Sequence, residues 1–184
     1  MTTFASRAAR IVVLVATALS FPQFAHPVLA SDQLEQVRPM DRRVEALVTK
    51  GMMRSRTIAL LVSELSRTDV VVYVRSTARR PSDLAGSIGF MGVGADGRRW
   101  LMVTLYGDEG WTTLEDAEER QLITLGHELR HALEVAADAR IATAEAFVTF
   151  YRANGHEWAK DRVDTHDARL AGRQVAQELG SSPE

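Results

Sequence analysis

The segment His-Glu-Leu-Arg-His at residues 127–131 constrains this chain most, because it spaces two histidines four residues apart. On an α-helix with 3.6 residues per turn, His127 and His131 lie about one turn apart on the same face. Both imidazoles can then reach one metal ion. Glu128 lies about 100° around the axis from His127, where its carboxylate can take a proton from water at such an ion.

An apolar stripe supports the helical interpretation of this motif. Leucine and alanine recur at helical spacing on the side opposite the two histidines, so one face can pack on a core while the other meets a cleft. The alternative is a helix whose polar side chains are simply solvated. The stripe consists of Leu122, Leu125, Leu129, Ala132, Leu133 and Ala136.

The segment Leu-Gly-His-Glu-Leu-Arg-His-Ala, residues 125–132, resembles the active-site helix of zincin metallopeptidases. In that family the two histidines bind zinc and the glutamate is the general base, which implies these roles for His127, His131 and Glu128. Most of the chain after residue 30 is also similar to small uncharacterised exported bacterial proteins with a His-Glu-Leu-x-His-Ala-x-Glu helix. The resemblance implies zinc-dependent hydrolysis of a peptide or protein substrate, without specifying which one.

The motif supplies two metal ligands, whereas a catalytic zinc site normally has three from the protein. Asp164 is the preferred third ligand, because it precedes the last expected helix, where a carboxylate suits the helix dipole. The similar exported proteins carry Glu-Thr where this chain has Asp164-Thr165. The alternative for Asp164 is a plain N-cap. Glu145 and His166 are further candidate ligands.

Glu134 lies three residues after His131 and within about 20° of His127 around the helix axis. We expect it to accept a ring N–H from a ligating histidine, or to hold Arg130 or Arg169. Direct metal ligation and simple surface exposure are the alternatives. The candidate donors to the attacked carbonyl oxygen are Tyr151, His156 and Arg130.

The first 30 residues have the pattern of a secretory signal peptide: Arg7 and Arg10, then an apolar run, then small residues ending at Ala30. The apolar run is shorter than the ~20 residues that a membrane-spanning helix needs, and an uncleaved anchor is the alternative. We therefore expect a signal peptide at 1–30, export to the periplasm or the medium, and no stable membrane association after cleavage. One zincin-like domain is expected at 31–184.

Charge and cysteine content limit the possible partners and ligands. The formal net charge is −2, which argues against binding to nucleic acid or to an anionic membrane surface. The chain has no cysteine, so disulfides, thiolate zinc ligands and a cysteine nucleophile are excluded. The sequence gives no indication of an oligomeric state.

The other segments predict an α+β fold with a small sheet of about three strands, followed by the long motif helix and C-terminal helices. Residues 31–38 are expected to form a loose N-terminal segment. The expected strands are Asp69–Arg75, Gly86–Val93 and Arg99–Tyr106, with a hairpin turn at Gly94–Gly97. The expected helices are Met40–Lys50 ended by Gly51, Thr57–Ser66, Thr113–Val135 with a capping box of Thr112 and Glu115, Ala142–Asn154, and His166–Leu179 capped by Asp164 or Thr165.

The resemblance to zincins also bears on the cleft, since in that family a strand before the metal helix offers its edge to the substrate. It implies that Leu101–Tyr106 lines the cleft and pairs with an extended peptide. The alternative is a purely structural hairpin.

Three functional interpretations remain open at this point. The first is an exported zinc metallopeptidase in which Glu128 activates a zinc-bound water. The second is an exported zinc-binding or partner-binding domain of zincin shape without efficient catalysis. The third is a structural domain in which the motif is fortuitous.

Overall fold

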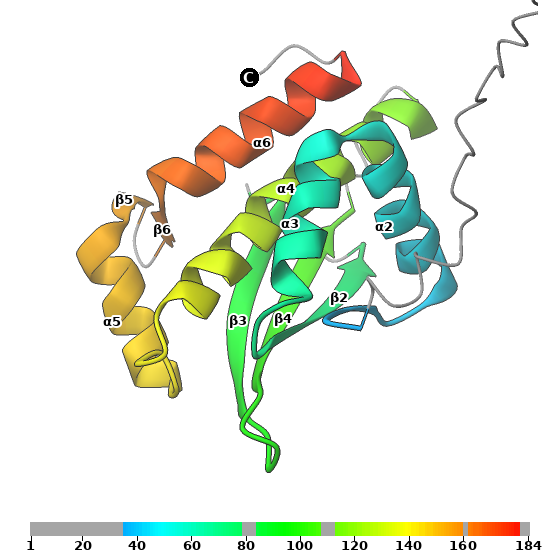
Figure 1. The fold of residues 1–184 in the computed structure, drawn as a ribbon. Helices are drawn as coiled ribbons and strands as arrows, with labels where there is room; N and C mark the ends of the chain where they lie inside the picture. The colour runs from blue at the N-terminus through cyan, green and yellow to red at the C-terminus, as the bar shows by residue number, and fades with distance from the viewer. Residues whose placement is uncertain (1–34, 79–83, 108–112, 160–161, 181–184) are drawn as a thin grey trace, which may run out of the picture.

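The computed structural model describes residues 35–78, 84–107, 113–159 and 162–180, so the expected signal peptide lies outside the described residues. Within them the chain forms five α-helices, a four-stranded mixed sheet and a two-stranded sheet (Figure 1). The α+β prediction is therefore confirmed. None of the described helices is long and apolar enough to cross a membrane.

The main sheet has the strand order β1-β2-β4-β3, in which β1, β2 and β4 are parallel and β3 runs antiparallel to β4. Strands β5 and β6 form a separate antiparallel hairpin. In chain order the elements are β1 (Val37–Pro39), α2 (Arg42–Arg54), α3 (Arg56–Leu65), β2 (Val70–Thr77), β3 (Gly86–Val93), β4 (Arg99–Tyr106), α4 (Leu114–Ala137), α5 (Ala144–Asn154), β5 (His156–Ala159), β6 (Arg162–Asp164) and α6 (His166–Leu179).

The main sheet has one strand more than expected, because β1 pairs with β2 where a loose N-terminal segment was predicted. Val37 is fully buried in this position. The β5–β6 hairpin is also absent from the sequence prediction, since strands of three or four residues are too short to show alternation. The predicted turn between β3 and β4 is confirmed, and Gly97 adopts a φ of 78° there, which favours glycine.

The prediction that Gly51 ends the first helix is wrong. Helix α2 continues to Arg54, and the side chain of Ser55 then caps the start of α3. Gly51 is buried where α2 approaches α4, and a methyl group added to it would lie 3.0 Å from Leu122 Cδ2. This glycine therefore permits a close helix contact, which local sequence cannot distinguish from a helix stop.

The starts of two later helices also differ from the prediction. Thr113 is the N-cap of α4, and its hydroxyl accepts a hydrogen bond from the Asp116 N–H at 3.1 Å. The predicted capping box is therefore wrong by one residue, and Thr112 lies outside the described residues. Helix α5 begins at Ala144 rather than Ala142, because Thr143 caps it.

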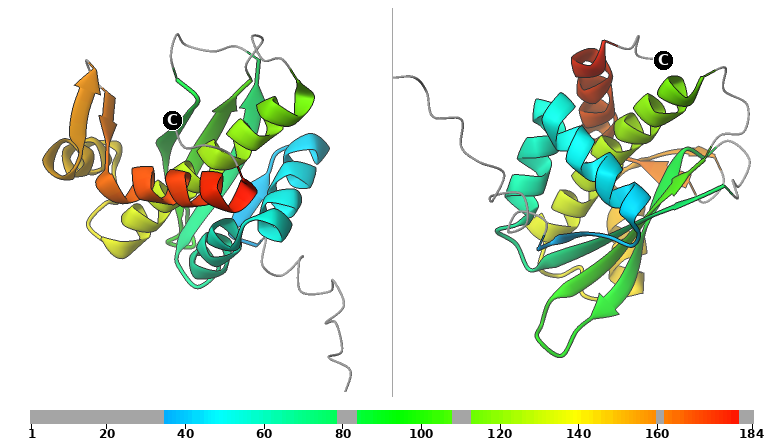
Figure 2. Two further views of the ribbon diagram at one scale, coloured as in Figure 1. Left: turned by 90° about the horizontal axis from the view of Figure 1, so that it is seen from above. Right: turned by 90° about the vertical axis from the view of Figure 1, so that its right-hand side faces the viewer.

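Helices α2 and α4 pack on one face of the main sheet, and α3 packs against both of these helices (Figure 2). Alternate residues of β4 point to that face and are fully buried, as are the first leucines of the α4 stripe. The residues of α4 that carry the polar motif are thereby turned toward the side where β3 and α5 lie. The core residues shared by β4 and α4 are Leu101, Val103, Leu105, Leu122, Leu125, Leu129 and Ala132.

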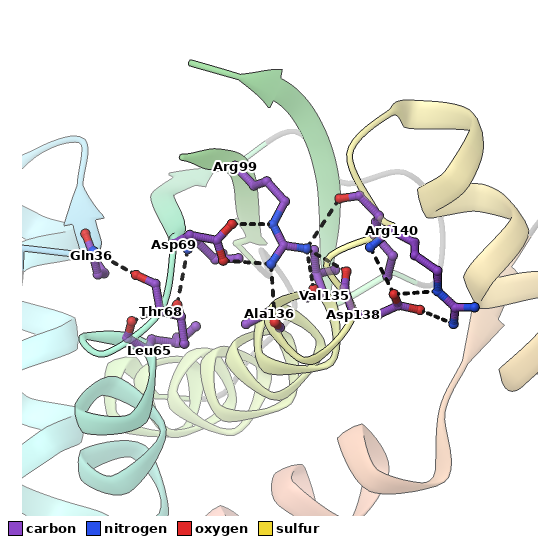
Figure 3. A network of polar contacts seen from close by, with 11 residues as sticks. Gln36, Leu65, Thr68, Asp69, Arg99, Val135, Ala136, Asp138 and Arg140 are labelled. Atoms are coloured by element: carbon purple, nitrogen blue, oxygen red, sulfur yellow. Dashed lines mark hydrogen bonds and ion pairs between the residues drawn. The ribbon is translucent and has the colours of Figure 1, made fainter. Parts of the chain in front are cut away.

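A buried arginine connects the C-terminal end of α4 to the sheet (Figure 3). Arg99, 3% exposed at the start of β4, donates two hydrogen bonds of 2.7 and 2.8 Å to the Asp69 carboxylate. It also donates to the carbonyl oxygens of Val135 and Asp138 at 2.7 Å and of Ala136 at 3.2 Å. The Val135 oxygen also accepts the Asp138 N–H at 3.3 Å, and the Asp138 oxygen accepts the Ile141 N–H at 3.1 Å. The guanidinium adds a charged donor to these oxygens and to that of Ala136, and so fixes the end of α4 on the sheet.

Helix α6 packs closely against α4 because α4 has a glycine at the contact. A methyl group added to Gly126 of α4 would lie 2.6 Å from Val175 Cγ2 of α6. At Gly172 of α6, an added methyl group would lie 3.6 Å from His127 Cβ, an ordinary contact distance, so this position lies beside the motif without requiring glycine. The start of α6 is therefore held beside the motif face of α4.

We predict that Arg99→Met destabilises the protein by about 2–4 kcal/mol, because the C-terminal end of α4 loses a buried charged donor to three carbonyl oxygens. The free energy of unfolding in urea measures this. Arg98→Met is the matched control, because Arg98 pairs with Asp96 at the surface and its loss should change stability by less than about 0.5 kcal/mol. Equal effects of the two variants would contradict the assigned role of Arg99.

Candidate metal centre

The two histidines of the motif lie beside a carboxylate from the β6–α6 junction. His127 and His131 project from α4, and Asp164 is the last residue of β6. Asp164 Oδ1 lies 3.3 Å from His127 Nε2 and 3.4 Å from His131 Nε2. One ligand atom from each of the three residues lies within 4.8 Å of the others, so this group could hold a metal ion.

The chemistry of this group fits a zinc ion. Asp164 Oδ1 is buried and accepts no hydrogen bond, so a buried negative oxygen lacks a donor. In a tetrahedral zinc site with bonds of about 2.1 Å, neighbouring ligand atoms are about 3.4 Å apart. The two nitrogen–oxygen distances match this separation. Two nitrogens and one carboxylate oxygen are also ligand types that zinc binds in catalytic sites.

His131 is held through its ring and through its backbone carbonyl oxygen. Its Nδ1 lies 2.9 Å from Glu134 Oε2, so the carboxylate accepts the Nδ1–H, and Nε2 faces Asp164. Tyr151 packs edge-on against the ring and donates a hydrogen bond of 3.0 Å to the His131 carbonyl oxygen. Glu134 therefore makes the histidine contact expected from the sequence. Of the two arginines expected as its other partners, Arg130 pairs with Asp167, and Arg169 Nε lies 4.0 Å from Asp164 Oδ2.

Glu128 lies on the β3 side of the group and is 5% exposed. Gly86, the first residue of β3, leaves room for it: an added methyl group would lie 2.8 Å from Glu128 Oε1 and 2.4 Å from Thr124 Cγ2. Burial is the main effect on this carboxyl group and raises its pKa. A carboxylate with a raised pKa is better suited to accept a proton near neutral pH.

One cleft of about 960 Å³ is lined by all four residues described above: His127, Glu128, His131 and Asp164. Its walls come from the start of β3, from α4, from α5 and from the β6 segment. Apart from these four residues, most of the wall is apolar. Its side chains include Ile88, Ile123, Phe147, Val148, Tyr151 and Val163.

The prediction that Leu101–Tyr106 lines the cleft is wrong, because β4 lies inside the sheet between β2 and β3. The antiparallel edge strand β3 borders the cleft instead, through Gly86, Ser87 and Ile88. Strand pairing depends on segments far apart in the chain, so the order of the strands could not be read from a local pattern. The hairpin signal alone did not indicate which of its strands forms the edge.

The other candidates from the sequence lie elsewhere. Glu145 and His166 are exposed and do not belong to the metal-binding group, and Thr165, rather than Asp164, is the N-cap of α6. Of the three candidate donors, Tyr151 lines the cleft, whereas Arg130 and His156 are not among its lining residues. No role at the site was predicted for Gly86 or Thr165, since a small residue or a helix cap has no functional signature in the sequence.

Comparisons with protein-family models, curated proteins and solved structures found no match for this chain.

The charged groups of the centre shift each other's pKa values in a consistent way. Burial lowers the pKa of His131, but the neighbouring Asp164 and Glu134 carboxylates outweigh it and raise that pKa to about 9. Burial raises the pKa of Asp164, but His127 and His131 lower it well below its ordinary value. Burial and nearby carboxylates raise the pKa of Tyr151, so its hydroxyl stays protonated.

These shifts predict how stability without metal depends on pH. The folded state raises the pKa of His131 from 6.5 to about 9. The contribution of His131 to the stability of the folded protein is therefore complete below pH 6.5 and is lost as the pH rises toward 9. The raised pKa of Glu128 acts in the same direction. With a chelator present, we expect the free energy of unfolding, measured in urea, to be about 2–3 kcal/mol lower at pH 9 than at pH 6.

The His131→Gln variant is the control, since it should lose most of this dependence. The same pH dependence in the variant and the wild type would contradict the assignment to His131. With zinc present the trend should reverse, because metal binding requires the unprotonated Nε2.

Proposed function

We propose that this protein is an exported zinc-dependent metallopeptidase that hydrolyses peptide bonds. The observation that carries the proposal is the convergence of His127, His131 and Asp164 within 4.8 Å, beside the buried Glu128 and at the wall of a cleft. Two histidines and one carboxylate leave a fourth tetrahedral position open, as catalysis requires. The resemblance of the motif helix to that of zincins supports the same assignment.

In this proposal His127, His131 and Asp164 hold the zinc ion and Glu128 is the general base. When bound, zinc supplies a Lewis acid that makes a water acidic and polarises the substrate carbonyl. Glu128 takes the proton as the water oxygen adds to the peptide carbonyl carbon. The carbon–nitrogen bond then breaks, and Glu128 returns the proton to the departing amine nitrogen.

The edge strand β3 is the proposed binding surface for the substrate backbone. Among the described strands, β3 pairs only with β4, so its other edge has backbone groups available for an extended peptide. The part of β3 that begins at Gly86 lies next to Glu128. A peptide paired there would pass directly beside the base.

The second candidate, a zinc-binding or partner-binding domain without efficient catalysis, is favoured by one observation. Tyr151 donates its hydroxyl hydrogen to the His131 carbonyl oxygen, so that hydrogen is not directed at a substrate. In this case the ligands would still bind zinc. The two candidates differ only in turnover.

We expect Glu128→Gln to bind zinc as tightly as the wild type, because Glu128 is not among the proposed ligands. Its rate of peptide cleavage should fall by about 10²–10⁴-fold with the loss of the base. A quenched fluorescent peptide library measures the rate, and elemental analysis measures the zinc. An undiminished rate in this variant would contradict the role of Glu128, and a zinc-loaded wild type without turnover would favour the second candidate.

A further inference from the structure

The Thr165 hydroxyl makes two hydrogen bonds, one with the backbone of α6 and one with a residue of the metal centre. Thr165 is 6% exposed and follows Asp164 directly in the chain. Its Oγ1 accepts a hydrogen bond of 3.2 Å from the Ala168 N–H, which caps α6. The same hydroxyl donates a hydrogen bond of 2.6 Å to Glu134 Oε1.

A hydroxyl group has one hydrogen, so these two bonds fix how the Thr165 side chain is used. The hydrogen goes to Glu134, and a lone pair receives the backbone N–H of α6. Glu134 is 10% exposed and uses its second oxygen, Oε2, to accept the N–H of His131 Nδ1. A continuous chain of hydrogen bonds therefore runs from the first turn of α6 through the carboxylate to the imidazole.

This chain of bonds acts on two of the three proposed ligands. Through Glu134 it keeps the hydrogen of His131 on Nδ1, which leaves Nε2 free to face the metal position. Through the backbone it fixes the residue after Asp164, and so the point from which that carboxylate reaches the histidines. Removal of the Thr165 hydroxyl would leave Glu134 with one buried oxygen short of a donor, free to rotate away from His131.

We propose that Thr165 is a positioning residue of the metal centre, which sets the tautomer of His131 and the reach of Asp164 through its hydroxyl. The inference rests on the zinc-binding part of the proposed function. It does not depend on turnover, so zinc affinity is its direct measure.

Thr143 provides a matched control, because it is the same residue type in the same capping role. Its hydroxyl accepts the Ala146 N–H at 3.1 Å at the start of α5, a helix that carries none of the three proposed ligands. Valine at either position removes one N-cap hydroxyl while keeping the β-branched shape. Only the change at Thr165 also removes the donor to Glu134.

The experiment is a competition titration of zinc against a chromophoric chelator, with urea unfolding in parallel. We expect Thr165→Val to bind zinc about 10–100-fold more weakly than the wild type, the range typical of lost partners of metal ligands. Thr165→Ser should bind within about threefold of the wild type, because serine keeps both hydrogen bonds. Thr143→Val should also bind within about threefold, although both valine variants lower the urea midpoint.

Glu134→Gln gives a second test that leaves the α6 cap intact. It should weaken zinc binding to a similar extent, because the amide has one acceptor oxygen where the carboxylate uses two. Equal zinc affinities of Thr165→Val and Thr143→Val would overturn this inference and leave the proposed function standing. Failure of the wild type to bind zinc would overturn both. An affinity loss in Thr165→Ser equal to that in Thr165→Val would also exclude a role for the hydroxyl.

Discussion

The close contact between α4 and α6 is the constraint on which the metal centre depends. The motif brings two imidazoles to one face of α4, but the third proposed ligand comes from a segment more than thirty residues later. Asp164 reaches the histidines only because α6 approaches α4 where Gly126 meets Val175 and Gly172 meets His127. Larger side chains at Gly126 would separate the helices and withdraw the carboxylate, so packing and site geometry depend on the same residues.

The main sheet also holds the motif helix α4 in place. Arg99 holds the C-terminal end of α4 against the starts of β2 and β4, while Gly86 lets the edge of β3 approach Glu128. The motif helix is thus held by the sheet on one side and by α6 on the other. Buried charged groups stay in place only when their partners are fixed, and here rigid elements carry the partners: Glu134 on α4, and Asp164 and Thr165 at the start of α6.

The parts of the site that depend on local geometry were predictable from the sequence, and those that depend on tertiary contacts were not. The four-residue spacing of His127 and His131 and the three-residue spacing to Glu134 follow from the helix repeat alone. Asp164 was predicted as the third ligand from its place before a helix. The edge position of β3 depends on pairing between distant strands, and Gly51 resembles a helix stop although it serves a close contact. Thr165 looks like any other N-cap until Glu134 is seen beside it.

The central claim is that His127, His131 and Asp164 together bind one zinc ion, and isothermal titration of the metal-free protein with zinc tests it most directly. The wild type should bind one zinc per chain, and Asp164→Ala should bind on the order of 100-fold more weakly, since it loses one of three ligands. Asp167→Ala is the matched control, because Asp167 lies nearby but pairs with Arg130 at the surface, and it should bind like the wild type. Wild-type affinity in Asp164→Ala would contradict the account.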